Sequence, residues 1–322
     1  MPFTITPTDV INEYGSYYIN SGQNMQSLLL RPFEAFGTRE AFTNVPTEDT
    51  QLRYSDVQVG EILQPYQDAF TAKGNVTFKP VTINLKPVKI DVSFNPQNLV
   101  YSWLGFLTST SVDRTEWPFT RWVIEIYLLK QLFADLEEKV IYKGVFAAHV
   151  ANTAGAAGIT MDGAEKVINN GITATRIVPI LIGAPSTDPV TWCTQVETFA
   201  KGLPEKYWEV AMTINMSRVL AKRYAEGKKA KYNMNYAQEA DLFTVAGFET
   251  LRVKGRASMQ GKTKIWATPL ENAVFATKGF ANANGFEIEK EKRNVHIFTD
   301  FHIGLGYLLE DLVFTSDSNL PA

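Results

Sequence analysis

The chain has 322 residues, of which 45% are hydrophobic and 20% are charged, a composition typical of globular proteins that excludes wholesale disorder and fibrous repeats. Its 31 Lys and Arg residues against 34 Asp and Glu residues give a formal net charge of −3, so no global field attracts nucleic acid or an anionic membrane. A single cysteine, Cys193, excludes an internal disulfide and an all-cysteine metal site, and the three histidines leave little material for catalysis.

The start of the chain contains no pattern of an export signal. No Lys or Arg precedes Arg31, and no apolar core follows the first residues. The apolar run at 177–184 is interrupted by Pro179 and is far shorter than the ~20 residues that span a bilayer. The sequence therefore predicts a protein that is made and kept in a cytosol, or built into something assembled there. At roughly 150 residues per domain, its length suits two structural units or one elaborate unit.

Residues 1–50 predict an irregular arm. They contain four prolines and apolar residues without a sustained period, among them Phe33, Phe36 and Phe42. Such a segment is too apolar for a solvated tail and too irregular to build a core. It is expected to lie across the surface of a neighbouring molecule, or to wrap around its own domain.

Residues 51–94 predict a long hairpin with a turn near 73–75, because apolar residues alternate along them. The alternating positions are Val57, Val59, Ile62, Val76, Phe78, Val81, Ile83, Leu85, Val88, Ile90, Val92 and Phe94. Their phase changes after Pro80 and after Pro87, which predicts a bulge or bend at each proline. A two-stranded ribbon is marginal alone in water, so its apolar face is expected on another surface. A hairpin within an ordinary sheet is the alternative.

Two helices are expected next. Asn95-Pro96 is typical of a helix start. The strongest helix pattern covers 116–143, with Pro118 in its first turn, Gly144 after its end and apolar residues at a spacing of three and four. At 1.5 Å per residue this helix would be a rod of roughly 40 Å, with one broad face for packing on a sheet.

An α/β stretch follows residues 145–163, which are rich in Ala and Gly and predict a mobile connection. Helices are expected from Asp188 to Gly202 and from Ser217 to Gly227. Strands are expected at 176–183, 208–214, 250–254 and 263–266. The tail predicts two further strands, 287–303 and 307–315, joined by a bend at Gly304-Leu-Gly306.

Few residues suggest catalysis or metal binding. Gly261-Lys-Thr263 lacks a glycine five positions earlier and precedes a strand, which favours a lysine-rich turn over a phosphate loop. His296, Asp300 and His302 share one face of a strand, but their spacing matches no compact ligand pattern, which favours a half-buried strand over a metal site. Cys193 is expected on the buried side of a helix, where a thiol is inert.

Lys and Arg residues form one local positive patch in the sequence. We interpret this patch as a solvated face or a contact between subunits and not as a nucleic-acid-binding surface. The acidic stretch at 135–138 of a neighbouring copy is a candidate partner. The patch consists of Arg218, Lys222, Arg223, Lys228, Lys229 and Lys231.

The order of these parts, together with two local patterns, resembles a known family. The patterns are Trp266-Ala-Thr-Pro269-Leu-Glu-Asn272-Ala-Val-Phe-Ala-Thr277 and Asn294-Val-His-Ile-Phe-Thr-Asp300-Phe-His-Ile-Gly304-Leu-Gly306-Tyr. A further point of resemblance is a strand followed by a short helix that ends in glycine, at 208–227. Over about 50–315 the chain resembles the major capsid proteins of tailed bacteriophages, which have the Hong Kong 97 fold.

The resemblance implies an α+β fold with four parts. Residues 1–50 would form an N-terminal arm, and 51–94 an extended loop over a neighbouring subunit. Residues 95–150 and 280–322 would form a peripheral domain with the 116–143 helix as its spine. Residues 151–279 would form an axial α/β domain. The implied contacts between subunits involve Phe33, Phe36, Phe42, Phe70, Lys73, Phe78 and Lys79.

The resemblance also implies a function. The chain would be a structural protein of the virion, without enzymatic activity or cofactor, that forms pentamers and hexamers of an icosahedral shell in the host cytoplasm. The shell would enclose double-stranded DNA without sequence-specific binding and without a membrane. A separate scaffold, a portal and decoration proteins are further implied partners.

Three alternatives remain open. The first is the shell protein of a cellular nanocompartment, built on the same fold and requiring a cargo-binding pocket. The second is an α/β hydrolase or transferase that uses carboxylates such as Asp300 and Glu310, although no nucleophile motif or paired acid and base supports it. The third is a phage tail or surface carbohydrate-binding protein, which the aromatic content favours and the long helix does not.

Overall fold

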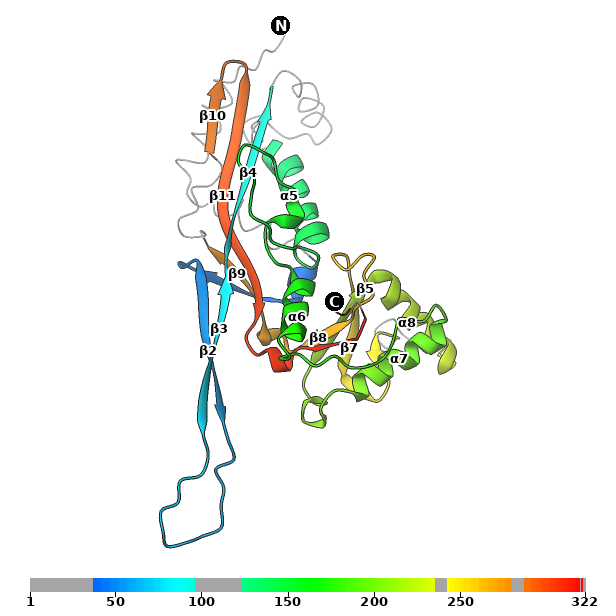
Figure 1. Cartoon of the computed structure of the whole chain (residues 1–322). Helices are drawn as coiled ribbons and strands as arrows, with labels where there is room; N and C mark the ends of the chain where they lie inside the picture. Colours follow the sequence, from blue (N-terminus) through cyan, green and yellow to red (C-terminus); the bar gives the residue numbers. More distant parts are fainter. Residues whose placement is uncertain (1–36, 96–122, 235–241, 279–286, 319, 321–322) are drawn as a thin grey trace, which may run out of the picture.

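The computed structural model describes residues 37–95, 123–234, 242–278, 287–318 and 320 (Figure 1). Within these ranges the chain forms two five-stranded sheets, a two-stranded ribbon and several helices, so the α+β prediction is confirmed. The first predicted helix, after Asn95, and most of the predicted arm, including Phe33 and Phe36, lie outside the described residues.

The first sheet is built around β11 (Asn294–Tyr307), and we call it the long sheet. One edge of β11 pairs with β4 (Lys86–Phe94). The other edge pairs first with β10 (Glu287–Glu291) and then with β9 (Ala273–Lys278). β1 (Thr43–Thr47) adds a parallel strand beyond β9.

A long helix lies along this sheet (Figure 1). It consists of a π-helical turn, η3 (Val123–Leu128), then α5 (Leu129–Asp135) and a second π-helical turn, η4 (Leu136–Val140). The helix predicted over 116–143 is thus helical over the described residues 123–140. Leu136 and Val140 are buried in one cluster with Phe301 and Ile303 of β11, as expected for an apolar helical face on a sheet.

Two glycines allow the chain to fold back where this helix ends. A Cβ atom at Gly144 would lie 2.5 Å from the Val140 carbonyl oxygen and 2.6 Å from that of Met161. A Cβ at Gly163 would also lie 2.6 Å from the Val140 oxygen. The 145–163 connection therefore returns to the helix end and leads directly into α6 (Ala164–Thr173), which packs in the same core as the long helix.

The second sheet, which we call the compact sheet, has the order β12-β8-β5-β7-β6. These strands are β12 (Phe314–Thr315), β8 (Trp266–Thr268), β5 (Met212–Ser217), β7 (Phe248–Arg256) and β6 (Thr244–Val245). Its core is completed by two helices, α7 (Pro189–Lys201) and α8 (Arg218–Lys231).

Both helix starts are as predicted. Asp188 caps α7, where its Oδ2 accepts a hydrogen bond of 2.8 Å from the Thr191 amide, and Pro189 occupies the first turn. The Ser217 hydroxyl accepts from the Leu220 amide at the start of α8. α8 continues four residues past the predicted end at Gly227, because Gly227 packs against the backbone of Pro189 and does not end the helix.

Short 3₁₀ turns connect the remaining elements. They are η1 (Thr38–Ala41), η5 (Ala157–Ile159), η6 (Glu205–Tyr207), η7 (Leu270–Asn272) and η8 (Glu310–Leu312).

Two strands predicted after the connection differ from the structure. Residues 176–183 make only a single bridge, between Ile180 and Ser316, and are not a strand. Pro179 has no amide to donate and interrupts the segment. The strand predicted from Trp208 begins at Met212 as β5, because η6 and the turn after it occupy the residues before.

The predicted bend at Gly304-Leu-Gly306 is also wrong, since these residues lie inside β11. The chain turns instead at Lys292, whose φ of 53° is left-handed and separates β10 from β11. The predicted 307–315 strand is reduced to β12, which joins the compact sheet and follows η8.

The ribbon consists of β2 (Gln51–Val59) and β3 (Val76–Asn84), and it projects away from both sheets (Figure 1). Its register is unbroken from Gln51 opposite Asn84 to Val59 opposite Val76, and Pro80 lies opposite Ser55. The register of β4 on β11 is likewise continuous through Pro87. Of the bulge or bend predicted at each proline, the bulge is therefore wrong at both.

The change of apolar phase has two other causes. At Leu85 the chain leaves the ribbon and enters the long sheet as a new strand. At Pro80 the apolar side chains change from one face of the ribbon to the other, because β-strand neighbours point to opposite faces.

Candidate functional site

The outer half of the hairpin exposes an unusual amount of apolar surface. Val57 faces Phe78 and Val59 faces Val76 across the ribbon, and all four side chains are exposed by half or more. In the loop at 60–75, Leu63 is 82% exposed, Tyr66 92% and Phe70 96%. We call the exposed apolar residues of this outer half the hairpin tip: Val57, Val59, Ile62, Leu63, Tyr66, Phe70, Val76 and Phe78. Large apolar groups gathered on one projecting element are typical of an interaction surface.

The loop of the hairpin tip is closed by its own polar groups. The Gly60 amide donates to the Asn75 carbonyl at 2.9 Å, and Lys73 Nζ lies 3.1 Å from a carboxylate oxygen of Glu61. Tyr66 Oη donates to Asp68 Oδ1 at 2.6 Å. These polar groups find their hydrogen-bond and ion-pair partners within the loop, while the apolar side chains remain exposed.

The inner half of the ribbon is anchored in its own chain. Ile83 is 4% exposed and packs with Leu85, Val274 and Ala276, with Leu52 beside them. Among the residues that the structure describes, the hairpin therefore has a fixed base and a tip that none of them covers.

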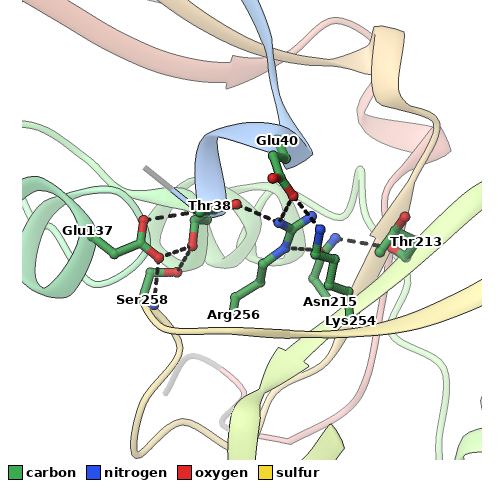
Figure 2. Close-up of polar contacts among 9 residues, drawn as sticks. Thr38, Glu40, Glu137, Thr213, Asn215, Lys254, Arg256 and Ser258 are labelled. Carbon is green, nitrogen blue, oxygen red and sulfur yellow. Dashed lines mark hydrogen bonds and ion pairs between the residues drawn. The ribbon is translucent and has the colours of Figure 1, made fainter. Parts of the chain in front are cut away.

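A second feature is a polar junction at the start of the described chain, drawn in Figure 2. The carboxylate of Glu137, on the long helix, accepts hydrogen bonds from the amide and hydroxyl of Thr38 and from the amide of Ser258. The hydroxyls of Thr38 and Ser258 lie 2.7 Å apart. One carboxylate thus joins η1, the long helix and the segment that follows β7.

Arg256 is the centre of the other half of this junction (Figure 2). Its side chain is 4% exposed, and its guanidinium donates to Asn215 Oδ1 at 2.8 Å and to the Gly37 carbonyl at 2.6 Å. It also lies 3.3 Å from Glu40, to which Lys254 donates a further hydrogen bond. This bond from Lys254 and the charge of Arg256 hold the pKa of Glu40 below its ordinary value, against partial burial. The junction fixes residue 37, the first residue that the structure describes.

The residues with potential catalytic or metal chemistry do not form a site. His296, Phe298, Asp300 and His302 share the less buried face of β11, as predicted, and His296 pairs with Glu291 at 3.1 Å. In the described part of the chain, no group of three or more His, Cys, Asp or Glu residues could hold a metal ion. Burial raises the pKa of the Cys193 thiol to about 12, and Glu197 adds to the shift.

The predicted positive patch is divided by the structure. Lys231 pairs with Glu197, Arg223 donates to the Ser186 carbonyl and Lys228 to the Thr244 carbonyl. The other three basic residues line a shallow groove of about 350 Å³ beside α8: Arg218, Lys222 and Lys229.

Across the described ranges, no helix is long and apolar enough to cross a membrane.

Of the predicted contact residues, Phe70, Lys73, Phe78 and Lys79 lie in the hairpin, and Phe70 and Phe78 are strongly exposed. The position of Phe42 differs from the prediction. The residue is 5% exposed, and the centroid of its ring lies 5.7 Å from that of Trp266 in the core of its own chain. The reason is that η1 is held at the polar junction, which directs the next residue inward.

Sequence reasoning did not include Leu63 and Tyr66 among the contact residues. The signal was present, since these are large apolar residues in a loop flanked by alternating strands. It also missed the polar junction, whose residues are far apart in the chain and share no motif.

Sequence comparison alone finds no matching family model and no similar curated protein. The three-dimensional structure, however, matches the procapsid of satellite phage P4, solved with its size-determination protein, with a TM-score of 0.60 over 92% of this chain and 90% of that chain at 12% identity. The chain has the fold of phage capsid proteins.

Two further capsid structures agree with this capsid fold. The capsid of Myoviridae phage XM1 matches with a TM-score of 0.54 at 11% identity, over 87% of this chain and 90% of that chain. The mature capsid of bacteriophage PhiM1 matches with a TM-score of 0.51 at 13% identity, over 89% of this chain and 88% of that chain. The structure therefore has the capsid fold that the sequence resemblance implies.

Proposed function

We propose that this chain is a major capsid protein that assembles into pentamers and hexamers of an icosahedral shell around double-stranded DNA. The observation that carries the proposal is the hairpin tip, a projecting apolar element that none of the described residues of its own chain covers. The capsid fold supports the same conclusion.

The exposed hairpin needs a surface of another molecule to cover its apolar residues. A two-stranded ribbon is marginally stable in water unless its apolar face is covered. Stable protein interfaces bury about 1,200–2,000 Å² with an apolar centre, and the aromatic and aliphatic residues of the hairpin tip would supply such a centre. In a closed shell each contact can be weak, because many repeated contacts act together.

Within this proposal we assign the parts of the chain as the family resemblance implies, with changes that the two sheets require. Residues 1–50 are the arm, 51–94 the extended loop, 95–150 and 280–322 the peripheral domain, and 151–279 the axial domain. α6, β4 and β9 are moved to the peripheral domain, because α6 shares the core of the long helix and both strands pair with β11. β12 is moved to the axial domain because it pairs with β8.

The first experiment is sedimentation of the full chain with negative-stain microscopy beside it. We expect rings or closed shells. A monodisperse monomer that persists at high concentration would overturn the proposal. The contents of native particles, DNA or a protein cargo, then separate a virus from a nanocompartment.

A pair of loop variants tests the part played by the hairpin tip. Leu63, Tyr66 and Phe70 are changed together to Ser, and the matched control changes Gln67, Ala69 and Thr71 to Ser in the same exposed loop, which leaves the hydrogen bond from Gln64 to the Thr71 carbonyl in place. We expect the first variant to remain folded and to sediment as subunits, and the control to assemble normally. Normal shells from the first variant would exclude the hairpin tip as an assembly surface. Residues 76–94 are left intact in this design, because β4 pairs with β11 along its length.

A further inference from the structure

The groove beside α8 has a basic rim and an apolar floor. Arg218, Lys222 and Lys229 follow one another along one face of α8, and all three are exposed. Glu226 is the acidic residue among the lining residues, so positive charge prevails. We call this surface the basic groove. Its floor consists of small and apolar residues: Ala221, Ala225, Leu242, Phe243 and Gly255.

The three cations of the rim are not neutralised by the described part of their own chain. Within the described ranges, no ion pair or side-chain hydrogen bond engages Arg218, Lys222 or Lys229. Two other lysines of the same helix differ, since Lys228 donates to a backbone carbonyl and Lys231 pairs with a carboxylate. An exposed row of positive charge beside an apolar floor fits a partner that carries carboxylates around an apolar group.

A surface of this complementary kind lies elsewhere on the compact sheet. The Thr250 hydroxyl donates to the Trp208 carbonyl at 2.6 Å, and the Trp208 ring lies edge-on to that of Phe248, with 5.3 Å between centroids. These contacts hold the turn after η6 against the start of β7 and leave Trp208 38% exposed. Three exposed carboxylates adjoin Trp208 and Phe248 in the chain, and we call them, together with Trp208, the acidic end: Glu205, Glu209 and Glu249.

The basic groove and the acidic end lie at opposite ends of one pair of strands. β5 and β7 run parallel, in register along all six residues of β5. Glu209 precedes β5 and Glu249 is the second residue of β7, whereas α8 starts at Arg218 directly after β5. At about 3.3 Å per residue, β5 separates the two surfaces by about 20 Å. One subunit therefore cannot join its own two surfaces, but two copies arranged head to tail can.

The acidic stretch at 135–138 is a weaker partner for the basic groove. Asp135 lies 2.6 Å from Lys139 Nζ, and Glu137 is engaged in the polar junction. Both carboxylates are thus already used within their own chain. The carboxylates of the acidic end, by contrast, have no ion pair or side-chain hydrogen bond among the described residues.

We propose that the basic groove of one subunit binds the acidic end of a second copy of the chain. The carboxylates meet the rim of the groove, and the exposed part of the Trp208 ring lies on its apolar floor. The contact joins two different surfaces, so its repetition orders successive subunits head to tail. Complementary charge of this kind fixes orientation and order more than it adds affinity. The proposal rests on the proposed function, because it states how neighbouring subunits of the shell recognise one another.

Charge reversal on each surface tests the contact. The groove variant carries Lys222→Glu and Lys229→Glu, and the end variant carries Glu209→Lys and Glu249→Lys, all at exposed positions. We expect each variant to need a concentration about tenfold higher, or more, for assembly in sedimentation, because like charges then face each other. Denaturant unfolding of the dissociated subunit should match the unaltered chain. Where reversal disturbs folding, Lys222→Gln with Lys229→Gln gives the same test with a smaller effect.

The matched control changes the charge equally at positions outside the compact sheet. Lys130→Glu with Arg293→Glu alters two exposed cations, one on the long helix and one in the turn before β11. We expect this control to assemble as the unaltered chain does. An equal loss in the control would assign the effect to net charge and overturn the proposal.

Recombination of the two surfaces tests whether they meet directly. A chain with all four reversals should assemble as the unaltered chain does, because the groove and the acidic end have exchanged signs. A mixture of the groove variant and the end variant should also associate at concentrations where neither does alone, because each surface then meets one of opposite sign. Failure of both recoveries, with folded subunits, would overturn the proposal.

The remaining outcomes separate this contact from the proposed function. Normal assembly of both reversal variants would overturn the contact and leave the shell-forming function standing. Normal shells of the groove variant that contain less DNA would assign the groove to nucleic acid and overturn the contact. An unaltered chain that stays monomeric would overturn the proposed function, and this proposal with it.

Discussion

Gly306 of β11 packs so closely against Ile83 at the base of the hairpin that a Cβ atom would lie 2.6 Å from Ile83 Cγ1. The neighbouring Gly304 is equally close to the backbone, since its Cβ would lie 2.8 Å from the Asn84 carbonyl oxygen. The two glycines let the hairpin base cross β11, and they fix where the projecting element leaves the long sheet.

Gly306→Ala is therefore expected to destabilise the fold. The added methyl group has no room between β11 and Ile83, and overpacking of this kind costs about 1–3 kcal/mol. Denaturant unfolding of the dissociated subunit measures the loss. Gly158→Ala is the control, because its Cβ would meet only the Lys139 oxygen at 3.5 Å, and it should be close to neutral.

Arg256→Met is expected to weaken the polar junction. The substitution leaves the buried Asn215 side-chain oxygen without its donor, at a cost of about 1–3 kcal/mol. The carbonyl of Gly37, an exposed residue, also loses its donor, but water can replace it. Lys254→Ala removes only the half-exposed pair with Glu40 and should cost about 0–1 kcal/mol. Equal losses in the two variants would contradict the role of Arg256 as the buried centre of the junction.

Glu197 should contribute to acid sensitivity. Burial raises its pKa, but hydrogen bonds from Lys231 and Tyr232 outweigh this, and the net pKa lies below the ordinary 4.5. A lowered carboxyl pKa stabilises the folded state above the unfolded-state value, and this stabilisation is lost as the pH falls through the folded-state value. Unfolding free energies measured in a pH series should therefore fall less steeply below about pH 4.5 in Glu197→Gln than in the unaltered chain. Parallel curves would contradict this.

Phe42→Ala tests the corrected position of this residue. Because the ring is packed in the core of its own chain, its truncation should lower the free energy of unfolding by about 3–5 kcal/mol. A contact between subunits would instead leave the isolated subunit unchanged. Chemical denaturation of the dissociated subunit separates the two outcomes.

These residues also indicate what the sequence could reveal. The long helix and the capped start of α7 were predictable, because apolar spacing and caps at Asp188 are local signals. The hairpin was predictable from alternation, but the cause of its phase change was not, since a change of face and a bulge give the same pattern. Gly304 and Gly306 were misread as a bend because their close contacts involve Ile83 and Asn84, more than 200 residues away. The junction around Arg256 has the same long-range origin.

Phe70→Ser should separate assembly from folding more sharply than any core variant. The ring is 96% exposed, so the isolated subunit loses almost no buried surface, and its unfolding free energy should stay within about 0.5 kcal/mol. Association should nevertheless weaken, because aromatic residues at the centre of an interface contribute about 2 kcal/mol or more. Sedimentation against concentration measures the second effect and denaturant unfolding the first. Ile83→Ser, at the buried base of the same hairpin, should show the reverse order and destabilise the subunit itself. If Phe70→Ser and Ile83→Ser affected folding equally, the hairpin tip would be part of the subunit core and not a surface for a neighbour.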